Sequence, residues 1–194
     1  MQTQSVARDP VIEYGSEGRP RMHRWPLPTD PQLLSGLLID IFERYWDRIV
    51  FGPAVDGAAY EWTCPCAPDR VEIDGEFLTI GFNGPHFHLC IGGGAESGGD
   101  TVRERRMREL RPGSACIYRA LDASGAPNSW GFEMRNAAGV SMLSIYFPNP
   151  FVLSGDRLST QPDWSRLEVW RDIARRYLGR EAEDFDESSH GFDR

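Results

Sequence analysis

Two short turn signals in the middle of the chain constrain its fold more than any other feature. Asp74-Gly75 and Asn83-Gly84 each separate runs of apolar and β-branched residues. Such dipeptides favour the two-residue turns that join antiparallel strands, because these turns require positive φ angles that Asn, Asp and Gly tolerate. The spacing therefore predicts three consecutive strands, at about 71–73, 77–82 and 86–91, that form a meander.

The second turn also predicts how the last two strands pair. A two-residue loop at Asn83-Gly84 places Ile80 opposite Phe87 and Gly81 opposite His86. Side chains alternate between the two faces of a strand, so one face of the meander is apolar and is expected to be the core side. That face comprises Val71, Ile73, Leu78, Ile80, Phe87, Leu89 and Ile91. The opposite face carries His86, His88 and Cys90, together with Arg70, Glu72, Phe77, Thr79 and Gly81.

The histidines and the cysteine on that second face predict a metal site. Same-side residues on a strand are about 6.5–7 Å apart, so neighbouring side chains can converge on one ion. Cys64-Pro65-Cys66 can supply further sulfur ligands. Such a set suits tetrahedral zinc best, with iron or copper as alternatives. The predicted ligands are His86, His88, Cys90, Cys64 and Cys66.

Three functions remain open from these residues. The first is a metal-dependent enzyme acting on a small molecule, with Glu72 as the general base beside a metal-bound water. The second is a non-catalytic metal-binding or accessory protein whose zinc is closed by four protein ligands. The third is a metal-free domain that holds a small anion through its sheet and arginines. Plain packing roles for the histidines and cysteines also remain open, since cysteine is often buried.

The remaining pattern predicts an α+β fold. Amphipathic helices are expected at 31–49, after an N-cap at Asp30, and at 162–178, before Gly179. Further strands are expected at 60–63, 115–121, 129–135 and 140–147. Together they give an antiparallel sheet of six to seven strands with both helices packed on one face. Residues 1–28 read as an extended arm, 29–179 as a single domain and 180–194 as an acidic flexible tail. The glycine-rich loop 92–100 is expected to act as a lid.

Charge and composition narrow the partners. The formal net charge of −8 disfavours nucleic acid and anionic membranes. The chain has no lysine, which excludes Schiff-base chemistry and a P-loop lysine. The polar N-terminus and the lack of a long apolar run predict a cytoplasmic protein. Arg119, Glu133 and Arg135 are fainter candidates for holding a carboxylate, and His23 and His190 receive no role.

Overall fold

The computed structural model describes residues 9–55, 57–93, 101–153, 155 and 157–192. Its main sheet is antiparallel and seven-stranded, in the order β1-β2-β10-β11-β12-β3-β6. The bounds of its strands are β1 Val11–Tyr14, β2 Pro20–Leu27, β10 Pro112–Leu121, β11 Pro127–Asn136, β12 Ser141–Tyr146, β3 Val50–Gly52 and β6 Trp62–Thr63. The predicted α+β class and the antiparallel sheet are confirmed.

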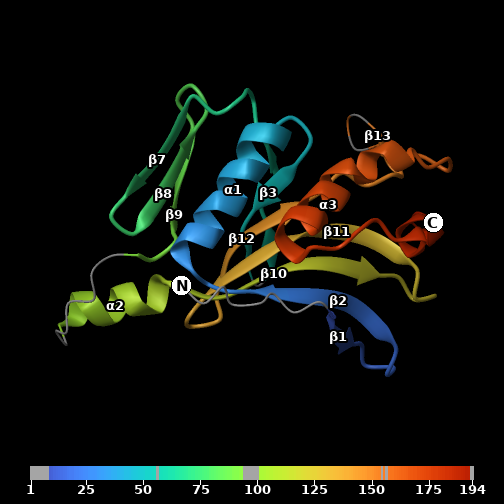
Figure 1. Ribbon diagram of the computed structural model, residues 1–194, viewed down its shortest axis with the longest axis horizontal. Helices are drawn as coiled ribbons and strands as arrows, with labels where there is room; N and C mark the ends of the chain where they lie inside the picture. The colour runs from blue at the N-terminus through green and yellow to red at the C-terminus, as the bar shows by residue number, and fades with distance from the viewer. Residues whose placement is uncertain (1–8, 56, 94–100, 154, 156, 193–194) are drawn as a thin grey trace. The chain divides into compact units, whose positions relative to one another are not determined.

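The predicted meander forms a sheet of its own, in which β7 (Arg70–Asp74), β8 (Phe77–Gly81) and β9 (His86–Cys90) lie side by side (Figure 1). Its register is the predicted one: Ile80 pairs with Phe87 and Gly81 with His86. The turn between β8 and β9 has φ values of 52° at Asn83 and 127° at Gly84, as a turn of this kind requires. Two further two-stranded sheets are β4 (Ala54–Val55) with β5 (Ala58–Ala59), and β13 (Val152–Leu153) with β14 (Arg157–Leu158).

The helices begin where the sequence indicates. Asp30 caps α1 (Pro31–Tyr45) by accepting hydrogen bonds from the backbone N–H groups of Gln32 and Leu33. Helix α1 ends at Tyr45, four residues before the predicted end. The second predicted helix is a run of three short pieces, which ends before Gly179 at a φ of 63°. These pieces are the 3₁₀ turn η1 (Trp164–Leu167), α3 (Glu168–Ile173) and the π-helical turn η2 (Ala174–Leu178). The remaining helices are α2 (Val102–Leu110) and the 3₁₀ turn η3 (Asp184–Ser188).

The chain divides into two compact units. The first comprises residues 1–27, 116–132 and 145–194, and the second comprises residues 28–115 and 133–144. The segment predicted to be an arm supplies strands β1 and β2, and the segment predicted to be a tail supplies η3. The boundaries predicted at 28 and 179 stay a prediction. Most of the predicted lid, residues 94–100, lies outside the described residues.

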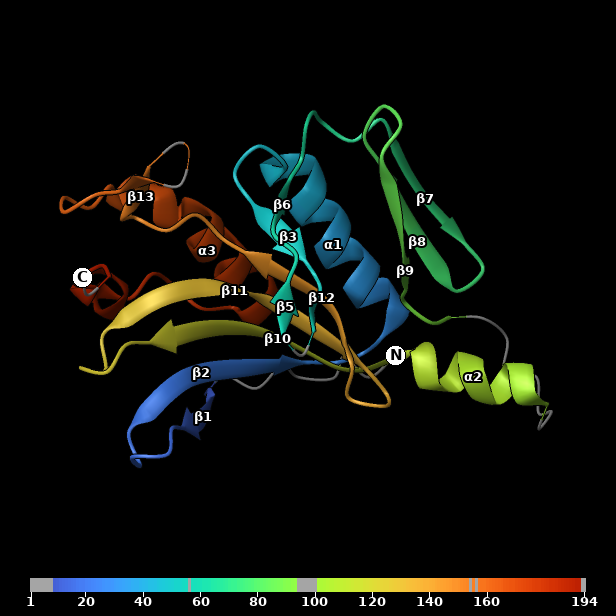
Figure 2. The same cartoon turned by 180° about the vertical axis from the view of Figure 1, so that it is seen from behind.

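Each unit has an aromatic core. In the second unit, α1 lies beside β3 (Figures 1 and 2), and the ring of Phe42 packs 4.8 Å from that of Phe51 and 5.4 Å from that of Phe87, between centroids. In the first unit, Trp25 and Trp170 pack 5.5 Å apart. One expected core residue is misplaced: Ile73 is 54% exposed, because β7 is the edge of the three-stranded sheet. No helix in the described part of the chain is long and apolar enough to cross a membrane.

Candidate functional site

The histidine pair of β9 is an exposed cluster in the second unit. The ring centroids of His86 and His88 are 5.1 Å apart, with 76° between the ring planes. Nδ1 of His86 lies 3.0 Å from the carbonyl oxygen of Gly84, and Nδ1 of His88 lies 2.7 Å from Oγ1 of Thr79. A carbonyl oxygen only accepts, so neutral His86 carries its proton on Nδ1 and keeps the Nε2 lone pair. His88 takes the same tautomer when the Thr79 hydroxyl accepts.

The cysteines are less accessible to a metal ion than the two exposed histidines. Burial raises the pKa of Cys64 to about 12, and burial also raises the pKa of Cys90 above its ordinary value. A thiolate is the form that binds a metal, and a raised pKa opposes it. Cys66 is partly buried, and its Sγ accepts a hydrogen bond from Nδ2 of Asn83 at 3.3 Å. All four cysteines are free thiols.

The five predicted ligands therefore do not form one cluster in the structure. Among the described residues, no group of three or more His, Cys, Asp or Glu side chains is arranged to hold a metal ion. Cys90 shares a face with the histidines in the strand register, yet it is buried, whereas His86 and His88 are exposed. Its surroundings include the ion pair between Glu76 and Arg111, which influences the pKa of Cys90. The structure thus brings together His86 and His88 and leaves the sulfur atoms out of an exposed site.

Glu72, the predicted general base, lies on the histidine-bearing face of the meander. Its register partner on β8 is Thr79, which in turn pairs with His88. The carboxylate accepts a hydrogen bond of 2.7 Å from Arg70, and both side chains are exposed. That hydrogen bond lowers the pKa of Glu72, which makes the carboxylate a weaker base. A catalytic role for Glu72 stays a prediction.

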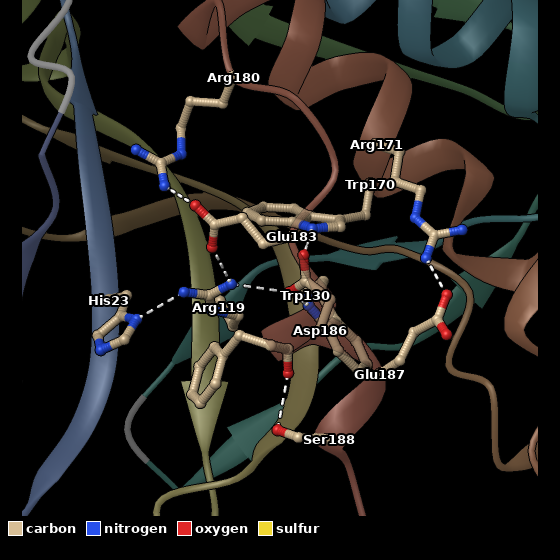
Figure 3. A network of polar contacts seen from close by, with 11 residues as sticks. His23, Arg119, Trp130, Trp170, Arg171, Arg180, Glu183, Asp186, Glu187 and Ser188 are labelled. Atoms are coloured by element: carbon tan, nitrogen blue, oxygen red, sulfur yellow. Dashed lines mark hydrogen bonds and ion pairs between the residues drawn. The ribbon is translucent and has the colours of Figure 1, made fainter.

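The second cluster is a buried ion network in the first unit, centred on Arg119 of β10 (Figure 3). The side chain of Arg119 is 4% exposed. Its NH1 donates to Oε2 of Glu183 and to Oδ1 of Asp186, both at 2.9 Å, and its NH2 lies 2.9 Å from Nδ1 of His23. Because a guanidinium only donates, Nδ1 of His23 is the acceptor and the imidazole is neutral. Arg180 also pairs with Glu183, so two cations and two carboxylates face each other.

Two tryptophans complete the contacts of Asp186. Trp130 of β11 donates from Nε1 to Oδ1 at 2.9 Å, and Trp170 of α3 donates from Nε1 to Oδ2 at 2.8 Å. Asp186 is 1% exposed as a residue. One buried carboxylate thus accepts hydrogen bonds from Arg119 and from both indoles, which offsets the cost of removing its charge from water.

The network changes the ionisation of its members. Burial, followed by the charge of Arg119, lowers the pKa of His23 below its ordinary value of 6.5, against the opposing influence of Glu183 and Asp186. The stability contributed by neutral His23 is therefore present above pH 6.5 and is lost as the pH falls through the lowered pKa. For Glu183, burial raises the pKa, but the hydrogen bond from Arg119 and the charges of Arg119 and Arg180 outweigh it, and the net pKa is lowered. Its contribution is present above its ordinary value of 4.5 and is lost at lower pH.

Sequence reasoning found this network only in part. Arg119 was a faint candidate for holding a carboxylate, His23 received no role, and Asp186 fell in the predicted flexible tail. The one available signal was an arginine among apolar residues in a strand, since a buried guanidinium needs a charged partner. Arg135 donates to the backbone oxygen of Gly139 instead of taking part in the network.

These observations define a small α+β protein with an exposed histidine pair and a buried ion network. The chain belongs to a family of unknown function (DUF7676), which it matches over residues 12–179. No curated protein matches the sequence. Among solved structures, the crystal structure of ChuX is similar, with a TM-score of 0.49 and 10% sequence identity, over 84% of this chain and 81% of that chain. A likeness at this level carries no argument about function.

Proposed function

We propose that the protein binds a divalent transition-metal ion, with zinc as the first candidate, through His86 and His88. The observation that carries the proposal is the geometry of the pair. Two imidazoles bound to one tetrahedral zinc through Zn–N bonds of about 2.0 Å have ring centroids about 5 Å apart. The centroids of His86 and His88 are 5.1 Å apart without a metal.

The hydrogen bonds behind the rings support the same proposal. Metal-binding histidines typically use their second ring nitrogen for a hydrogen bond that fixes the tautomer and the ring orientation. Gly84 and Thr79 occupy the Nδ1 atoms of His86 and His88, so Nε2 is the nitrogen left for an ion on each ring. Both imidazoles stand on one strand, which is a rigid support.

Two protein ligands leave two tetrahedral positions for water or a small molecule. An open shell favours an exchangeable metal or a metal-dependent reaction over a structural zinc, which needs about four protein ligands. Glu72 lies on the same face of the meander and can accept a proton from a metal-bound water there.

The test is titration of tag-free protein with zinc sulfate, followed by calorimetry and by competition with a chromogenic chelator. The wild-type chain should bind one equivalent, and the double variant His86→Ala/His88→Ala should lose it. His190→Ala, which removes an exposed histidine elsewhere, is the matched control and should bind as the wild type does. Thr79→Val removes only the hydroxyl that holds His88 and should weaken binding about 10-fold.

Two results would contradict the proposal. Equal zinc uptake by the wild type and the double variant would place the metal elsewhere. Loss of binding in Cys64→Ser would show that sulfur belongs to the shell and that the pair alone is not the site.

A further inference from the structure

The buried network contains a ready-made set of donors for one carboxylate. Arg119, Trp130 and Trp170 lie on β10, β11 and α3, and their three donor atoms converge on Asp186 at 2.8 to 2.9 Å. Figure 3 shows the two indoles and the guanidinium directed at the same side chain. The guanidinium is a charged donor and the two indole N–H groups are neutral donors. Together they suit a carboxylate that is held away from water.

The acceptor and the donors come from different parts of the chain. The donors lie at positions 119, 130 and 170, and Asp186 lies on the short 3₁₀ turn η3. The match to the family spans residues 12–179 and thus includes all three donors, whereas Asp186 follows its end. The three donors therefore lie within the matched residues, and Asp186 lies after them.

The same turn also places an aromatic ring beside the carboxylate, the 38% exposed side chain of Phe185. The guanidinium carbon of Arg119 lies 4.5 Å from the centroid of the Phe185 ring. The His23 ring stacks on Phe185 at 6.0 Å, with 28° between the planes. Phe185 and Asp186 thus present an aromatic ring and a carboxylate together, which are the two groups of a small aromatic acid.

The site holds more donors than Asp186 uses. Nε of Arg119 and Nε1 of Trp25 are buried and have no acceptor among the described residues. The Trp25 ring lies 5.4 Å from the guanidinium carbon of Arg119, so both donors belong to the same neighbourhood. A buried donor without an acceptor costs about 1–3 kcal/mol, and a ligand with more than one acceptor atom would recover part of that cost.

We propose that Arg119, Trp130 and Trp170 form a binding site for a small aromatic carboxylate, which Phe185 and Asp186 occupy as an internal ligand. An external acid binds by displacing η3. A tethered ligand competes at a high effective concentration, so the intact chain binds the external acid weakly. Removing the internal carboxylate makes the same donors available. The site shares no residue with the histidine pair. The experiments on this site and on metal binding therefore test two independent proposals.

The test compares phenylacetate binding to the full-length wild type and to Asp186→Ala. Calorimetric titration should show binding about 10-fold or more tighter in the variant, because the external carboxylate no longer competes with that of Asp186 for the three donors. Glu187→Ala is the matched control: it removes a carboxylate from the same turn, but one that pairs with Arg171 at the surface. It should bind phenylacetate as the wild type does. Phenylacetamide, which lacks the charge, should not bind Asp186→Ala.

Other results of these titrations would either support or contradict the proposed carboxylate site. Equal affinity in the wild type and Asp186→Ala, with both chains folded, would overturn the proposal. The network would then only stabilise the fold. Asp186→Asn keeps the shape of the side chain and should show the same tighter binding. If either variant unfolds in buffer, recovery of cooperative unfolding on adding phenylacetate supports the proposal. Lack of recovery counts against it.

Discussion

Replacing Asp186 with alanine should destabilise the protein through three donors at once. Among the described residues, the indole N–H groups of Trp130 and Trp170 lose their acceptor, and Arg119 keeps Glu183 and His23. A buried donor left without an acceptor costs about 1–3 kcal/mol, and breaking a buried charge pair costs about 3–5 kcal/mol. Because Glu183 still neutralises Arg119, the loss comes mainly from the two indoles, which together cost about 2–6 kcal/mol, and we expect about 3–4 kcal/mol. Domains of this size have total stabilities of about 5–15 kcal/mol, so the loss would be large.

Urea unfolding followed by tryptophan fluorescence measures this loss as a difference in the free energy of unfolding. Glu187→Ala, on the same turn, should cost at most about 1 kcal/mol, because its partner Arg171 lies near the surface. A cycle with Trp170→Phe isolates one hydrogen bond: the double variant should lose less than the sum of the single variants. A cost below about 1 kcal/mol for Asp186→Ala would refute the reasoning, since the carboxylate would then contribute no more than a surface group.

Three further predictions follow from other contacts. The free energy of unfolding should fall as the pH drops below 6.5, and fall less in His23→Gln, because protonated His23 cannot accept the hydrogen bond from Arg119. Equal pH slopes in urea unfolding would refute this. Gly131→Ala should cost at least about 2 kcal/mol in thermal unfolding, because its Cβ would lie 2.2 Å from the Ile145 carbonyl oxygen; an unchanged transition would contradict the packing. Native Cys64 should react slowly with iodoacetamide near pH 8, because its pKa is about 12, and rapid labelling seen by mass spectrometry would show that the thiol is not buried.

The local features of the fold follow from the sequence. The Asn83-Gly84 turn determined the register of β8 and β9, and Asp30 determined the start of α1. Both depend on residues close together in the chain, where turn geometry and capping act without help from distant parts. Alternation along β9 likewise placed the two histidines on one face.

Burial at the ends of elements was decided by tertiary contacts. Alternation correctly placed Cys90 on the same face of β9 as His86 and His88. It did not predict that other parts of the chain bury this cysteine and so raise its pKa. The exposure of Ile73 depends on β7 being an edge strand, which periodicity does not reveal. A predicted ligand set therefore requires the positions of neighbouring elements as well as a strand pattern.

The ion network was determined only by the tertiary structure. Its pairs join residues that are 64, 67 and 96 positions apart: Arg119 with Glu183, with Asp186 and with His23. Hydrophobic periodicity reports which residues are buried locally, and it carries no information about which distant charge meets a buried arginine. The partner of Arg119 is determined by the order of the strands and by the position of η3. A buried guanidinium is stable only where the fold brings carboxylates to it.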